Sequence, residues 1–93
     1  MQVTLLGKRW KLQFLPLGRF GHESEIVLGM CDPPTKPHKE IRIDSRLKDQ
    51  ERLEVLLHEM LHAVDWNQSE EIIASQAHDI AKVLWKLGYR QNE

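Results

Sequence analysis

Five consecutive residues, His58-Glu59-Met60-Leu61-His62, combine two imidazoles and a carboxylate at a spacing that suits metal chemistry. Residues four apart on an α-helix lie about one turn apart on the same face, so both imidazoles can reach one ion. Neutral imidazole is a good ligand for Zn²⁺. Glu59 lies about 100° further round such a helix, where its carboxylate can approach a zinc-bound water without taking a coordination position. The motif therefore predicts a zinc site with His58 and His62 as ligands and Glu59 as general base.

A catalytic zinc needs a third protein ligand and one open position. Glu70 and Glu71 follow the motif at the start of a second helical pattern. Glu70 shares a helical face with the apolar residues Ile73 and Ala77, so it points toward the helix-helix interface, whereas Glu71 lies further round toward solvent. We expect Glu70 to be the third ligand, with Glu71 as the alternative. Both carboxylates could instead simply complement the positive end of their helix.

Three further side chains are weaker candidates. Asp65 follows His62 by three residues and faces the same way, so it could bind the metal or accept a hydrogen bond from a ligand histidine. A solvated carboxylate explains Asp65 equally well, and we rank it below Glu70 and Glu71. His78 is expected to be exposed, and Cys31 to be a small buried residue rather than a thiolate ligand.

The chain around the motif is helical in pattern. Apolar residues at helical spacing predict a helix over about residues 47–66, with Asp44 or Ser45 as its N-cap. A second helix begins after the N-cap Ser69 and ends before Gly88. Its apolar stripe consists of Ile73, Ala77, Ile80, Ala81, Leu84 and Leu87. The short connection between the two implies an antiparallel helical hairpin.

The first half of the chain alternates apolar and polar residues with the period of strands. The pattern predicts a hairpin over residues 3–14 that turns near Gly7, and further strands over residues 26–30 and 40–44. Three prolines in residues 31–37 predict a loop. We therefore expect one α+β domain over residues 1–93. A small, mostly antiparallel sheet from residues 1–45 would pack on the antiparallel helical hairpin of residues 46–88.

Composition excludes several classes of protein. The 93 residues carry a formal net charge of -1, which implies no attraction to nucleic acid or to an anionic membrane. The chain holds one cysteine, Cys31, so it can form no internal disulfide. It shows neither a signal-peptide pattern nor an apolar run long enough to cross a bilayer. We expect a cytoplasmic protein, and the pattern leaves its oligomeric state open.

The stretch from Val55 to Ala63 resembles the active-site helix of minimal zincins, among them the SprT-like proteins and the peptidase domain of ImmA/IrrE-like regulators. More widely, residues 31–89 resemble small phage and bacterial proteins with the same HExxH core. The resemblance implies zinc on the two histidines, a base at Glu59 and a third ligand from the next helix. It also implies a sheet whose edge strand could align an extended peptide, for which residues 41–44 are the candidate.

The chain departs from two zincin patterns. Asp65 and Gln68 stand where the metzincin motif continues with glycine and histidine, and SprT-like proteins use a third histidine, for which His78 is the remaining candidate. A glutamate from the following helix, as in gluzincins, is the pattern that fits. We therefore expect a zinc metallopeptidase that hydrolyses a peptide or protein substrate through a zinc-activated water.

Two other functions are compatible with the same residues. One is a non-catalytic metal-binding regulatory module, whose site would be closed by a fourth ligand such as Asp65 or Cys31. The other is a metal-free interaction domain that binds a partner through its helical hairpin. Its stability would not depend on zinc.

Overall fold

A computed structural model describes residues 1–18 and 27–91. Four strands precede two helices along the chain. They are β1 (Gln2–Leu5), β2 (Lys8–Leu15), β3 (Gly29–Cys31), β4 (Glu40–Asp44), α1 (Asp49–Val64) and α2 (Glu70–Lys86). The expected α+β class is confirmed.

The strands form one sheet in the order β1-β2-β4-β3. β1 pairs with β2 and β3 pairs with β4 in antiparallel fashion, whereas β2 and β4 run parallel. The sheet is therefore mixed but mostly antiparallel, as predicted. The β1–β2 hairpin turns through Leu6 and Gly7, which have φ angles of 49° and 72°. Positive φ at both residues is what a two-residue type I′ turn requires.

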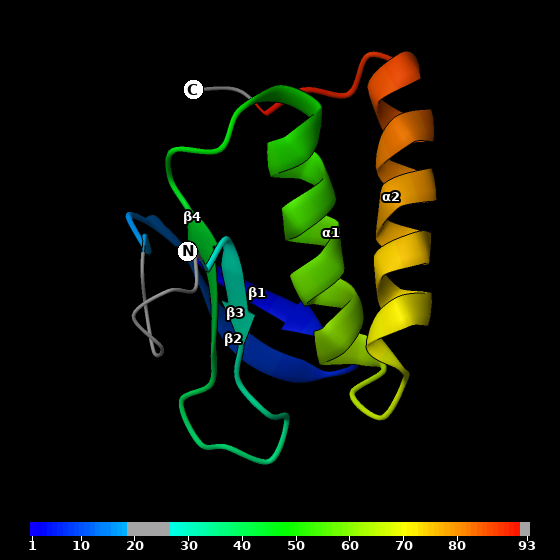
Figure 1. The fold of residues 1–93 in the computed structure, drawn as a ribbon. Helices are drawn as coiled ribbons and strands as arrows, with labels where there is room; N and C mark the ends of the chain where they lie inside the picture. The colour runs from blue at the N-terminus through cyan, green and yellow to red at the C-terminus, as the bar shows by residue number, and fades with distance from the viewer. Residues whose placement is uncertain (19–26, 92–93) are drawn as a thin grey trace.

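The helices lie in two successive layers on one face of the sheet (Figure 1). α1 packs against β1, β3 and β4, and the antiparallel α2 packs on the far side of α1. The core between the sheet and α1 contains Trp10, Leu12, Ile41, Ile43, Leu47 and Ala63. α1 is therefore packed between the sheet on one side and α2 on the other.

The predicted N-cap of the first helix is wrong. α1 begins after Lys48, whose side chain makes no capping hydrogen bond. The Asp44 carboxylate instead accepts hydrogen bonds from the backbone N–H of Arg46 at 3.0 Å and from its guanidinium at 2.9 and 3.0 Å. Asp44 is thus used to close the turn that leads out of β4, and α1 starts a few residues later than expected.

The predicted ends of the second helix are confirmed. Ser69 Oγ accepts a hydrogen bond from the Ile72 backbone N–H at 3.3 Å. At the other end Gly88 has φ of 91°, a conformation that favours glycine after a helix. These two caps fix α2 between Glu70 and Lys86, so the first turn of α2 starts directly after the short connection from α1.

The strand predictions hold with shifted bounds. The strand expected over residues 26–30 is β3, which runs from Gly29 to Cys31, and Ile26 lies outside the described residues. The strand expected over residues 40–44 is β4. Among the described residues, no helix is long and apolar enough to span a bilayer.

Candidate metal centre

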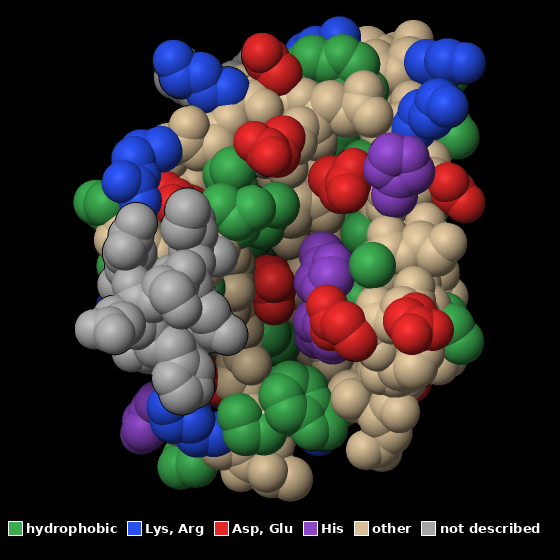
Figure 2. All heavy atoms as spheres, viewed as in Figure 1, with side chains coloured by type: hydrophobic (Ala, Val, Ile, Leu, Met, Phe, Trp, Pro, Cys, Tyr) green, Lys and Arg blue, Asp and Glu red, His purple; other side chains and the backbone are tan. Residues whose placement is uncertain are grey.

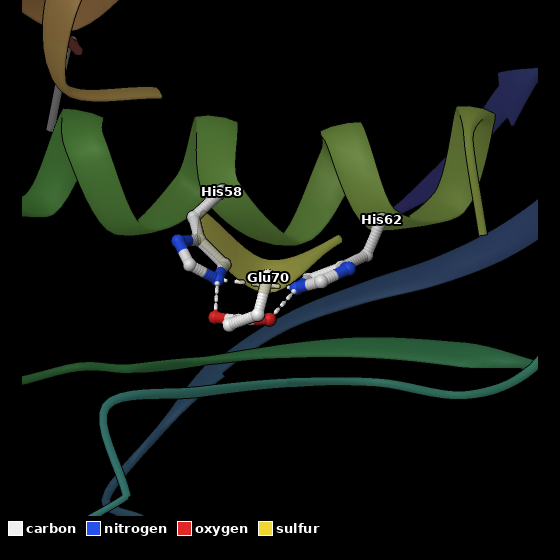
Figure 3. Close-up of side chains that lie close together, drawn as sticks. All are labelled: His58, His62 and Glu70. Carbon is white, nitrogen blue, oxygen red and sulfur yellow. Dashed lines mark hydrogen bonds and ion pairs between the residues drawn. The ribbon is translucent and has the colours of Figure 1, made fainter. Parts of the chain in front are cut away.

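Three side chains from two helices converge on one point (Figure 3). The Nε2 atoms of His58 and His62 lie 3.1 Å apart. The Glu70 carboxylate meets both, with Oε1 at 2.7 Å from His58 Nε2 and Oε2 at 2.8 Å from His62 Nε2. The structure therefore brings together His58, His62 and Glu70, the glutamate that was favoured over Glu71 because it shares a helical face with apolar residues.

Local structure explains this meeting. His58 and His62 lie one turn apart on α1, so their rings project from one face. The residues that follow α1 reverse the chain within a few positions, and the cap at Ser69 starts α2 immediately. Glu70 lies on the side of α2 that also buries Ile73 and Ala77 against α1. The antiparallel pairing thus places the first turn of α2 beside the last turns of α1.

The donor set fits a zinc ion. Two imidazole nitrogens and one carboxylate oxygen are a common ligand set for zinc. A tetrahedral ion with ligands at about 2.0–2.1 Å separates those ligands by about 3.3 Å. The two Nε2 atoms lie 3.1 Å apart, close to this separation, and they contact different oxygens of the Glu70 carboxylate, at 2.7 and 2.8 Å. One ligand atom from each of the three residues lies within 4.8 Å of the others. The Glu70 side chain is exposed, so a small rotation would bring one of its oxygens into place beside both nitrogens.

Glu59 occupies a different position from the three converging side chains. It is buried, with 8% of its surface exposed, and Gly29 of β3 lies directly against it. A Cβ on Gly29 would approach Glu59 Cγ and Oε2 to 2.8 Å, so only glycine leaves room for this carboxylate. Burial raises the pKa of Glu59 to about 7, with the Glu70 charge adding to the rise and His58 opposing it.

A cleft of about 370 Å³ opens over these residues. β3 forms one wall, and His58, Glu59, His62 and Glu70 form the other, with Trp66 at one end. Figure 2 shows acidic and histidine side chains meeting in the middle of this face, between the strands and α2. A larger cavity of about 580 Å³ lies between the other ends of the two helices, and none of the converging side chains lines it.

The structure places the lower-ranked carboxylates elsewhere. Glu71 is exposed and does not belong to the cluster. Asp65 is the exposed C-cap of α1, where its backbone N–H donates to the Leu61 carbonyl. In the described part of the chain, neither joins the group of atoms from His58, His62 and Glu70 that could hold a metal ion.

His78 and Cys31 are not brought into the cluster either. His78 Nδ1 lies 3.0 Å from Glu54 Oε1 on the exposed surface of the helical hairpin. Cys31 lines the cleft, and its Sγ contacts the Asp32 carbonyl at 3.4 Å. Burial, followed by the charges of Glu59 and Asp32, raises the pKa of the Cys31 thiol to about 12.

Sequence reasoning missed Gly29 and Trp66, which both line the cleft. Gly29 carries no signal of its own, because a glycine in a short apolar run can have many reasons. Trp66 is exposed, and its ring lies 6.4 Å from the His62 ring in an edge-on arrangement. Both residues come from segments whose position depends on the packing of α1 against the sheet.

The expected edge strand is also corrected. Residues 41–44 belong to β4, which lies between β2 and β3 and is therefore an interior strand. The edge strand beside the cleft is β3.

Comparisons of the chain with family models, with curated proteins and with solved structures find no match.

Proposed function

We propose that this protein is a zinc-dependent peptidase. The observation that carries the proposal is the convergence of His58 Nε2, His62 Nε2 and the Glu70 carboxylate, each within 3.1 Å of the next. Both histidines belong to α1, and the carboxylate that they contact belongs to α2. The meeting depends on the antiparallel packing of α2 on α1, which gives the three donors a common centre.

The surroundings favour a catalytic site over a structural one. Structural zinc sites are usually closed by four protein ligands, whereas catalytic sites keep one position open. Within the described residues, the cluster contains three ligand side chains and faces the cleft along β3. A bound zinc ion would polarise a substrate carbonyl and lower the pKa of a water molecule at the open position.

The other residues of the cleft have roles that follow from their positions. Glu59 lies beside the cluster without belonging to it, so its carboxylate is free to take up a proton and to hold it at Oε1 or Oε2. β3 is an edge strand that lines the cleft, and its backbone can pair with an extended peptide. The substrate we propose is therefore a peptide or an extended protein segment.

We propose the cytoplasm as the compartment, because a lone cysteine such as Cys31, which can form no internal disulfide, is typical of proteins in a reducing environment. The net charge of -1 gives no reason to invoke a nucleic acid or a membrane surface as a partner.

Metal analysis tests the proposal. Elemental mass spectrometry of the purified and dialysed protein should find about one zinc per chain, as expected for a three-ligand site. His58→Ala and Glu70→Ala should each lose most of it. Glu71→Ala is the matched control, because it removes a neighbouring carboxylate on the same turn of α2 and should retain the metal.

The outcomes separate the alternatives. Zinc in the wild type but no hydrolysis of any peptide in a mixed library would favour the non-catalytic metal-binding module. A wild type that takes up no zinc after incubation would leave the metal-free interaction domain. Loss of zinc in Glu71→Ala but not in Glu70→Ala would reverse the assignment of the third ligand.

A further inference from the structure

α2 forms the outermost layer of the molecule. Within the described residues it packs on α1 and on no strand, so one side of the helix is covered and the rest faces outward (Figure 1). The covered side buries Ile73, Ala77 and Ala81 completely. A helix in this position is expected to carry polar residues on its remaining surface.

The outward surface of α2 does not follow that expectation. Large apolar side chains occur there at helical spacing, and each has between 41% and 68% of its surface exposed. Together with the Gln76 amide they form the outer stripe, which consists of Ile72, Gln76, Ile80, Val83 and Leu87. At 100° per residue these positions fall within about 80° of one another, on a line beside the face that packs on α1.

We propose that the outer stripe pairs two copies of this chain, with the α2 helices antiparallel. The spacing of the stripe is the first argument. Ile72 and Leu87, and likewise Gln76 and Val83, lie at equal distances from the midpoint between Asp79 and Ile80. A two-fold axis through that midpoint therefore brings Ile72 of one copy opposite Leu87 of the other, sets the two Ile80 side chains next to each other at the axis, and places Val83 opposite the Gln76 amide.

Charge is the second argument. Outside the buried face, the acidic residues Glu71 and Asp79 flank the N-terminal half of the outer stripe, and the basic residues Lys82 and Lys86 flank its C-terminal half. Antiparallel pairing places the acidic half of one stripe along the basic half of the other, and it also opposes the two helix dipoles. All four charged residues fall on one flank of the stripe, and an antiparallel two-fold pair sets this flank of one helix beside the same flank of the other, whereas a parallel pair separates the two flanks. The charges therefore favour the antiparallel orientation.

Size predicts the strength of the pairing. The stripe extends over about 23 Å of helix, which makes an interface at the small end of the range for specific protein pairs. We therefore expect a dimer that dissociates in the micromolar range, rather than a permanent one. The proposal goes beyond the proposed peptidase function and does not depend on it, because no zinc-binding residue belongs to the stripe.

Analytical ultracentrifugation over a wide concentration range tests the pairing. The mass should rise from that of the single chain, 10.9 kDa, toward twice that value as the concentration increases. Val83→Glu and Ile80→Glu should each weaken the dimer by more than about tenfold, because every such change affects both copies. Leu6→Glu is the control, since Leu6 is 73% exposed at the β1–β2 turn, outside α2 and the outer stripe, and should leave the mass curve unchanged.

A charge exchange tests the orientation. Asp79→Lys and Lys82→Glu should each weaken the dimer, because each sets like charges across the antiparallel pair. The double variant should recover most of the affinity, since it restores opposite charges with their positions exchanged. Circular dichroism of every variant establishes that the fold is retained.

Three results would overturn the proposal. A folded wild type that stays at 10.9 kDa up to millimolar concentration forms no pair, and the stripe would then belong to another partner. A dimer that Leu6→Glu disrupts and Val83→Glu does not would use a different surface. Additive weakening in the double charge variant would exclude the antiparallel arrangement.

Discussion

At the scale of single residues, the charge of the ligands decides what a metal at this site can do. Two neutral imidazoles and one carboxylate leave a divalent ion with a net charge of about +1. An ion bound by these three side chains would therefore remain electrophilic, whereas sites rich in thiolate or carboxylate ligands neutralise it. Glu59 lies outside this set of three side chains. It is buried, and because burial raises the pKa of a carboxyl group, Glu59 takes up a proton more readily than a surface carboxylate does.

Replacing Glu59 with glutamine should separate metal binding from catalysis. The amide retains the shape of the carboxylate but cannot take up a proton, so zinc content should stay at the wild-type level. Peptide hydrolysis should fall by at least about 100-fold, the usual contribution of general base catalysis. Steady-state kinetics and metal analysis on the same preparation measure both effects. Wild-type turnover in Glu59→Gln would show that another group accepts the proton.

Gly29→Ala tests the close contact between β3 and the Glu59 side chain. Alanine can adopt the backbone conformation of this strand residue, but its methyl group would lie 2.8 Å from the Glu59 carboxylate and 2.9 Å from Val55 Cγ1. Since the Glu59 side chain must move aside, we expect hydrolysis to fall by about 100-fold, the scale seen when a catalytic group is displaced by an ångström. Zinc content should not change, because the atoms nearest to a Cβ on Gly29 belong to Glu59 and Val55, and neither is a proposed ligand. Unaltered kinetics in Gly29→Ala would mean that Glu59 acts from another position.

At the scale of the elements, the junction between β4 and α1 sets where the motif helix begins. Asp44 is buried at the end of β4 and binds Arg46 through its backbone and its guanidinium. The hydrogen bonds from the Arg46 side chain, followed by its backbone N–H and charge, lower the pKa of Asp44 to about 2. The Asp44 carboxylate therefore stabilises the turn between β4 and α1, the helix that carries both histidines.

The acid stability of the protein should depend on this junction. Because the pKa of Asp44 in the folded state lies below its ordinary value of 3.8, the charged carboxylate stabilises the fold above about pH 4. That stabilisation disappears as the pH falls through about 2. Urea unfolding without metal should show Asp44→Asn to be less stable than the wild type at pH 7, with the difference shrinking toward pH 2. Arg46→Met should behave in the same way, and a gap that stays constant with pH would contradict the proposed pair.

At the scale of the whole molecule, the site combines residues from the sheet, from α1 and from α2. His58 and His62 come from α1, Glu70 from the outer layer, and Gly29 from the sheet. A chain of 93 residues buries a thin core and has little stability to spare. A metal ion that links α1 to α2 should therefore contribute a large share of the total stability.

Zinc should raise the thermal stability of the metal-free protein. At a free zinc concentration 100 times the dissociation constant, binding adds about 2.7 kcal/mol, which for a domain of this size raises Tm by more than about 10 °C. His62→Ala should show a much smaller rise in Tm, because only two of the three proposed ligands remain and zinc binds more weakly. Differential scanning calorimetry with and without zinc measures both. An equal rise in the wild type and in His62→Ala would indicate that zinc binds elsewhere.

The sequence by itself determined the parts of this protein that depend on local spacing. Period-2 and helical patterns predicted the α+β class, the hairpin of β1 and β2, and both helices, because these patterns reflect which side of an element is apolar. The capping chemistry of Ser69 and Gly88 likewise placed the ends of α2. The four-residue spacing of His58 and His62 was enough to place both rings on one face.

Only the tertiary structure decided what lies opposite these elements. Asp44 was a credible N-cap by type, but a neighbouring arginine competes for its carboxylate. β4 is interior and β3 is the edge strand beside the cleft, since strand order is a long-range property that no local pattern contains. The contact of Gly29 with Glu59 has the same origin. It joins residues 30 positions apart, and it exists only because α1 packs against β3 on one face of the sheet.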